Sequence, residues 1–201
     1  MRSSPSGSDA PRAGMIATAA LVVLAFGSQT ASSAIADPER LATVVLRVLG
    51  YDRDLPADVG ETVDVDVVVS TGAPVPKACS ALARAFADIA QHFSLASLPI
   101  RIRDVEATTQ WLAGWQQADR RPDAVVLCTT LPTSMHHWLA TAAAAHRVRV
   151  VGLRPEDIDD GAGVAVVPEG DSFAVYVNLH TARAQGASFE PRLLSLARVV
   201  R

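Results

Sequence analysis

The sequence is poor in aromatic residues, which make up only 5% of its 201 residues. Hydrophobic residues nevertheless make up 49%, so valine, leucine, isoleucine and alanine must build any core. A chain of this length has room for one ordinary domain. We therefore expect a single domain with an aliphatic core.

The chain also lacks an excess of positive charge. Its formal net charge is −3 at pH 7. A nucleic-acid-binding domain normally carries a clustered positive face, so this class of partner is not expected. The weak acidity decides nothing about small ligands.

No apolar run reaches the roughly 20 residues that a membrane-spanning helix needs. The apolar run at residues 15–27 follows a leader with two arginines and precedes an Ala-x-Ala site at 34–36. This order is typical of a secretory signal peptide, whereas the alternative is an uncleaved membrane anchor. We expect cleavage of residues 1–36, which leaves residues 37–201 as a soluble periplasmic domain that does not itself span the membrane.

Motifs of catalysis and ligand binding are missing. No GxGxxG or phosphate-binding loop follows a predicted strand, and no serine sits in a GxSxG elbow. His136 and His137 point about 100° apart on a helix and cannot chelate one ion together. The acidic stretch at 154–160 lacks calcium-loop spacing and is interpreted as a solvated loop. We expect no catalytic residue, no metal site and no cofactor.

The hydrophobic pattern alternates between strand and helix periods along most of the chain. This alternation predicts a three-layer α/β domain with a mostly parallel sheet in the strand order 2-1-3-4. The predicted helices cover residues 38–49, 77–93, 106–118 and 132–146, and the predicted strands cover 62–70, 99–105, 123–128 and 148–153.

The pattern changes after residue 160. Two β-type runs at 163–167 and 173–177 are separated by five residues that include Pro and Gly, which predicts an antiparallel hairpin at one sheet edge. A closing helix is expected from Ser188 to the last residue. Its apolar face should pack on the sheet through Leu193, Leu194, Ala197 and Val200.

Charged residues alternate with apolar ones in two predicted strands. In strand 62–70, Asp64 and Asp66 predict an exposed beginning before a fully buried centre. In strand 99–105, Arg101 and Arg103 form a polar face, which predicts a half-exposed strand near an edge.

Two apolar stripes need a covering surface. Leu41, Val45 and Val48 share one face of the first helix, which must pack on the domain or on a second copy. Trp111 and Trp115 lie four positions apart, and either core packing or a partner surface accounts for them.

The chain has two cysteines, Cys79 and Cys128. In an oxidising compartment an even pair is a candidate disulfide. The predicted strand order brings both residues to the carboxyl edge of the sheet, whereas the alternative is two buried thiols. A bridge would contribute roughly 3–4 kcal/mol by the chain-entropy argument.

Three segments together resemble the YfiR-like family of small periplasmic proteins. These are LATVVLRVLGYDR at 41–53, VNL-x-x-AR-x-x-G at 177–186 and LL-x-LARVVR at 193–201. The resemblance covers the mature chain, and its motif residues are Asn178, Leu179, Ala182, Arg183, Gly186, Leu193, Leu194, Leu196, Ala197 and Arg198.

The resemblance implies a non-enzymatic regulator that dimerises. Such a protein would bind and inhibit the periplasmic sensor region of an inner-membrane signalling protein, such as a diguanylate cyclase that makes cyclic-di-GMP. The alternative is a small periplasmic solute-binding module that uses the carboxyl edge of the sheet.

Overall fold

The computed structural model describes residues 37–72 and 74–200, so the predicted signal peptide lies outside the described residues. The helices are α1 (Pro38–Gly50), α2 (Leu55–Asp58), α3 (Lys77–Ala90), α4 (Thr109–Gly114), α5 (Thr133–His146), α6 (Glu156–Asp159), α7 (Leu179–Ala184) and α8 (Pro191–Leu196). The strands are β1 (Val63–Ser70), β2 (Ile100–Glu106), β3 (Ala124–Leu127), β4 (Arg149–Gly152), β5 (Val164–Glu169), β6 (Ser172–Asn178) and β7 (Arg198–Val200).

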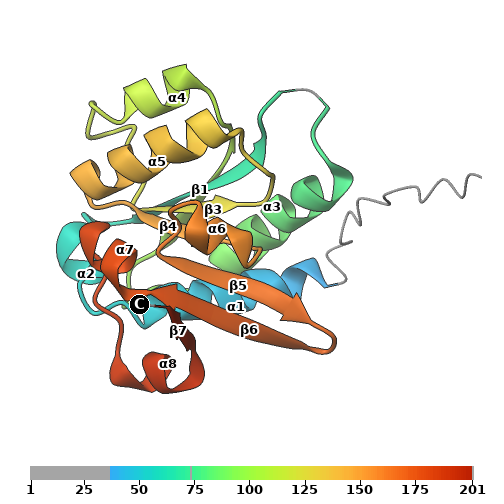
Figure 1. Ribbon diagram of the computed structural model, residues 1–201, viewed down its shortest axis with the longest axis vertical. Helices are drawn as coiled ribbons and strands as arrows, with labels where there is room; N and C mark the ends of the chain where they lie inside the picture. Colours follow the sequence, from blue (N-terminus) through green and yellow to red (C-terminus); the bar gives the residue numbers. More distant parts are fainter. Residues whose placement is uncertain (1–36, 73, 201) are drawn as a thin grey trace, which may run out of the picture. The chain divides into compact units, whose positions relative to one another are not determined.

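One sheet joins the strands in the order β2-β1-β3-β4-β5-β6-β7 (Figure 1). The predicted parallel order 2-1-3-4 is confirmed, and β5 continues it in parallel beside β4. β5 and β6 form the predicted antiparallel hairpin. Its loop is two residues long rather than five, because Glu169 pairs directly with Ser172 and Gly170 makes the turn at a φ of +57°.

Helices cover both faces of the sheet, which gives the predicted three layers (Figure 1). α1 and α3 pack on the face that carries Val65, Val67 and Val126. α4 and α5 pack on the opposite face, which carries Val125 and Leu127. Because both faces are covered, β1, β3 and β4 are buried along their whole length.

The prediction that β1 begins exposed is wrong. Asp64 is 8% exposed and Asp66 is 1% exposed. Edge strand β2 places Arg101 directly beside Asp64 and Arg103 directly beside Asp66, and these pairs form ion pairs of 2.5 and 2.6 Å. The arginines neutralise and cover the two carboxylates, so a strand with charged residues can be buried.

The last segment of the chain, from Asn178 onwards, is called the tail. It also differs from its prediction, because its last helix ends at Leu196 and the chain continues as strand β7. β7 pairs in parallel with β6, so the two valines at 199 and 200 take the extended conformation that β-branched residues favour. Ser188 is not the cap; the residue before the helix is Glu190, and Pro191 occupies the first turn.

Only part of the predicted apolar face of the tail is buried. Leu193 is 3% exposed, and Leu194 and Ala197 are partly buried against the core. Val200, the fourth residue of that predicted face, is partly buried in β7, whereas Leu196, which lies outside the face, is 75% exposed. In the described part of the chain no helix combines the length and apolar character that a membrane crossing requires.

Removal of Ser188–Arg201 is expected to unfold the domain. The truncation removes the buried side chains of Phe189 and Leu193 together with strand β7. Each large buried side chain contributes about 1.5–3 kcal/mol, against a total stability of about 5–15 kcal/mol for a typical domain. Circular dichroism and thermal melting measure the outcome.

A chain that ends after Ala197 is the matched control, because it loses β7 alone and keeps both apolar side chains. We expect it to stay folded with a lower melting temperature. Native circular dichroism and an unchanged melting temperature for the longer truncation would contradict the structural role of the tail.

Candidate functional site

The exit of the first helix and the tail lie side by side. The Arg53 N–H donates to the Ser188 carbonyl at 3.0 Å, and the Glu190 N–H donates to the Tyr51 carbonyl at 2.9 Å. An isolated antiparallel bridge joins Asp52 to Phe189 between them. The first segment of the family resemblance, residues 41–53, therefore contacts residues 188–190, which lie between the other two segments of the resemblance.

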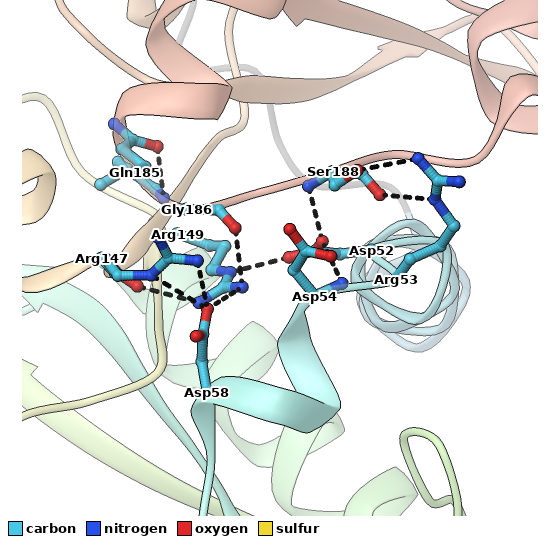
Figure 2. A network of polar contacts seen from close by, with 10 residues as sticks. Asp52, Arg53, Asp54, Asp58, Arg147, Arg149, Gln185, Gly186 and Ser188 are labelled. Atoms are coloured by element: carbon cyan, nitrogen blue, oxygen red, sulfur yellow. Dashed lines mark hydrogen bonds and ion pairs between the residues drawn. The ribbon is translucent and has the colours of Figure 1, made fainter.

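A buried carboxylate organises this contact (Figure 2). Asp52 is 3% exposed. Its Oδ1 accepts hydrogen bonds from the Ser188 N–H at 2.7 Å and the Asp54 N–H at 3.1 Å. Its Oδ2 accepts from Arg149 Nε at 2.7 Å. The tail is thus bound through its backbone to a charge inside the domain.

Arg149 is the buried cation of this network, with 2% of its side chain exposed. Besides Asp52, its Nη2 donates to Asp58 Oδ2 at 2.7 Å and to the Gly186 carbonyl at 3.1 Å. Its Nη1 donates to the Arg147 carbonyl at 2.9 Å. Every nitrogen of the guanidinium donates at least one hydrogen bond, so this arginine connects α1, α2, β4 and the tail.

The motif residues of the tail mostly serve the fold. The Asn178 side chain caps α7 by accepting from the N–H groups of His180 and Thr181, each at 3.1 Å. Ala182 is 2% exposed. Gly186 has a φ of +84°, and a Cβ there would lie 3.0 Å from Arg147 Cβ, so glycine alone fits without strain.

The other motif residues are more exposed. Leu179 is partly buried against the core, whereas Arg183 is exposed. Arg198 is exposed and pairs with Glu169, Nη2 to Oε2, at 2.9 Å. Folding therefore explains the buried members of the motif but does not by itself explain Arg183 or Leu196.

Three buried polar residues were not predicted from the sequence, namely Asp52, Arg149 and Gln185. Gln185 is 1% exposed; its Oε1 accepts from the Val150 N–H at 3.0 Å and its Nε2 donates to the Gly161 carbonyl at 2.9 Å. The sequence offered one indication of this network. Arg149 opens an otherwise apolar strand, and a charged side chain in such a strand needs a buried partner.

The two cysteines form a disulfide between Cys79 and Cys128, with their Cα atoms 5.6 Å apart. Cys79 lies in the first turn of α3, and Cys128 directly follows β3. The bridge therefore joins the connections that follow the adjacent strands β1 and β3. Doubly wound domains bind ligands at the point where the strand order reverses, which here lies between these two strands.

The acidic stretch after β4 is not a solvated loop. It forms the short helix α6, and Asp157 is 0% exposed. The Asp157 carboxylate accepts from the N–H groups of Leu153 at 2.9 Å and Arg154 at 3.0 Å, and it also pairs with the Arg154 side chain. A Cβ at Gly152 would lie 2.3 Å from Asp157 Cβ, so only glycine at position 152 leaves room for the Asp157 side chain.

The predicted partner surfaces are corrected, because most of their side chains lie inside the domain. Leu41, Val45 and Val48 are at most 3% exposed. Trp115 is 1% exposed and meets the ring of Trp111 edge to face at 5.1 Å. The half-buried Trp111 donates its Nε1 proton to Asp66 at 2.8 Å. Core packing is therefore the correct interpretation of both stripes.

Two open hollows lie beside the amino ends of the parallel strands. Asp58 and Asp123 line both, and the hollows have volumes of about 210 and 460 Å³. Burial raises the pKa of Asp123 above its ordinary value, although the hydrogen bond that the carboxylate accepts from the Asp64 N–H opposes this. Among the residues that the structure describes, no three His, Cys, Asp or Glu side chains are placed to hold a metal ion.

Replacement of Asp52 by alanine is expected to lower the free energy of unfolding by about 3–5 kcal/mol, because it leaves Arg149 buried with one charge partner fewer. Asp54→Ala is the control, since its side chain is exposed next to the network, and it should change stability by less than about 0.5 kcal/mol. Urea unfolding measures both. Equal effects of the two substitutions would contradict the role of Asp52.

The network also predicts a pH dependence. Burial alone would raise the pKa of Asp58, but hydrogen bonds from Arg149 and Arg147 outweigh it and hold the pKa below the ordinary 3.8. A lowered pKa contributes stability above the unfolded value, and this contribution is lost as the pH falls through the folded value.

Asp58→Asn should therefore destabilise the domain by about 1–3 kcal/mol at neutral pH, and the difference from the unchanged chain should shrink towards pH 3 or so. Urea unfolding at a series of pH values checks this. A difference that stays constant with pH would show that the charge of Asp58 is not what stabilises the fold.

Comparisons with known proteins agree with this architecture. Among solved structures, the chain resembles the ABC domain in complex with L-Trp from Streptococcus pneumonia, with a TM-score of 0.59 and 12% identity over 80% of this chain and 62% of that one. It also resembles a conserved domain protein from Vibrio cholerae O1 biovar El Tor, with a TM-score of 0.56 and 11% identity over 82% of this chain and 60% of that one.

At these identities the likeness shows the α/β fold alone, and the chain spans about three fifths of each solved structure. No curated protein matches the chain. The profile of the family described as YfiR/HmsC-like matches residues 41–198, which includes the first-helix exit, the disulfide and the tail. The chain therefore belongs to the YfiR/HmsC-like family.

Proposed function

We propose that this chain is a non-enzymatic periplasmic regulator that binds the periplasmic sensor region of an inner-membrane signalling protein, such as a diguanylate cyclase, and inhibits it. The observation that carries this proposal is the family match over residues 41–198. Membership supports a periplasmic regulator at the level of the family, and the identity of the target is the finer part of the proposal.

The carboxyl edge of the sheet favours a protein-binding role over a ligand-binding one. The Cys79–Cys128 bridge crosses the point where a doubly wound domain would hold a small molecule. A covalent link there holds the connections after β1 and β3 together, which leaves little freedom to open a crevice between them.

Export to the periplasm is part of the proposal. We expect cleavage of residues 1–36 to release a domain that starts at Asp37. The structure of the described part is compatible with this start, because the Asp37 carboxylate accepts the Arg40 N–H at 2.9 Å and caps α1. Mass spectrometry of the exported protein should find Asp37 as its first residue.

Deletion of the gene in its own host tests the regulatory role. We expect cellular cyclic-di-GMP to rise several-fold, and expression of the full chain to restore the original level. A chain that lacks residues 1–36 is the matched control, because the same domain then stays in the cytoplasm and should not restore it. Crosslinking from the periplasm should recover a membrane protein with a periplasmic sensor region.

Unchanged cyclic-di-GMP on deletion, together with no signalling protein among the crosslinked products, would exclude the proposal. Equal restoration by the chain without residues 1–36 would exclude a periplasmic site of action.

The second candidate is a small periplasmic solute-binding module. The solved domain from Streptococcus pneumonia that shares this fold is in complex with L-Trp, which is the observation that favours it. Thermal melting with L-tryptophan and other amino acids separates the two functions. A regulator should show no shift, whereas a rise of several degrees with one compound would favour the solute-binding module.

A further inference from the structure

Residues 108–121, which contain α4 and are called the α4 segment, are held on the domain by few buried side chains. α4 lies beside α5 (Figure 1). None of the six residues of α4 is buried, and the five residues after Trp115 are all exposed. Trp115 is the one buried residue of the segment. A region with so few buried contacts is expected to open at a lower free energy than the core strands.

Two polar groups are buried beneath the α4 segment. Asp66 is 1% exposed, and it accepts hydrogen bonds from Trp111 Nε1 at 2.8 Å and from Arg103 Nε at 2.6 Å. The ring of Trp115 is buried too, and no residue that the structure describes accepts its Nε1 proton. A buried carboxylate and a buried donor without an acceptor both lower the stability of the closed segment, because each has lost its hydration. Opening of the segment returns both groups to water.

The charged groups around Asp66 come from the two edge strands of the sheet at this end. β2 supplies Arg103, whose Nη2 also donates to the Arg120 carbonyl at 3.3 Å, near the end of the α4 segment. β1 supplies Asp64, which is paired with Arg101. α4 and α5 contain no Asp, Glu, Lys or Arg, and β3 places an apolar residue beside Asp66. Asp66 is therefore the group through which a change of charge reaches α4.

The protonation of Asp66 is coupled to its burial. Burial raises the pKa of Asp66 above the ordinary 3.8, and the charge of Asp64 adds to this, although bonds from Trp111 and Arg103 oppose it. Because α4 covers Asp66 through Trp111, opening of the segment returns the pKa towards its ordinary value. A raised pKa in the closed state stabilises that state fully below the ordinary value, and this contribution is lost as the pH rises through the raised value.

We propose that the α4 segment opens and closes on the sheet under the control of Asp66, so that protonation of this carboxylate favours the closed segment and its ionisation favours opening. The open segment exposes the ring of Trp115 and gives its Nε1 proton to water. This pH-sensitive device is independent of the proposed regulatory target, and its test measures the exported chain alone.

Native-state hydrogen exchange, followed by NMR from about pH 3 to about pH 7, tests the proposal. The Leu112 N–H donates to the Thr108 carbonyl at 3.2 Å, and the Trp115 N–H donates to the Leu112 carbonyl at 3.1 Å. Both amides should exchange at a lower free energy than amides of β3, through local opening. Their opening constant should be smallest below pH 3.8 and should rise by up to about tenfold per pH unit above it, until it levels off.

Matched substitutions identify the carboxylate responsible. Asp66→Asn keeps the shape of the side chain but cannot ionise, so its opening constant should not change with pH. Asp104→Asn is the control, because Asp104 is an exposed carboxylate that follows Arg103 on β2, and this variant should keep the pH dependence of the unchanged chain.

Trp111→Phe keeps the test decisive if Asp66→Asn fails to fold, which circular dichroism reveals. This variant keeps an aromatic ring but removes the donor to Asp66, so the opening constant at neutral pH should rise several-fold. Since the indole bond lowers the pKa of Asp66, its loss should also extend the rise of the opening constant to higher pH.

Three results would overturn the proposal. They are exchange of the α4 segment only through global unfolding, an opening constant that stays the same over the whole pH range, and a pH dependence that Asp104→Asn removes as fully as Asp66→Asn.

Discussion

The buried guanidinium of Arg149 is the constraint on which the rest of the structure depends. A charge inside a domain is tolerated only when its partners are all in place. Here the partners come from the exit of α1, from α2, from Arg147 at the end of α5 and from the tail. Because these elements must assemble around one side chain, the tail is a part of the core fold and not an appendage. The close approach of Gly186 to Arg147 belongs to the same assembly.

Much of the fold follows from periodicity, but the polar contacts do not. The order of the first four strands could be predicted because each is separated from the next by a helix of sufficient length. The end of the tail could not, because Val199 and Val200 fit a helical stripe as well as a strand, and only pairing with β6 decides between them. Likewise, Asp52 and Arg149 are 97 positions apart, and no local pattern links them.

The structure separates what the family motif does for folding from what it leaves for function. Asn178 caps a helix, Gly186 permits a close approach and Leu193 fills the core. The disulfide crosses the place where related architectures hold ligands. Surfaces for other proteins must then lie on exposed elements, of which the uncharged outer face of α5 and the exposed end of α8 stand out.

Native-state hydrogen exchange of the tail tests the central claim most directly, because the Ser188 amide is bound by the buried Asp52 and the Glu190 amide by the Tyr51 carbonyl. If the tail is part of the core fold, both amides should exchange with the same free energy as amides of β3, through global unfolding. Exchange at a much lower free energy, through local opening of the tail while β3 stays protected, would contradict the account.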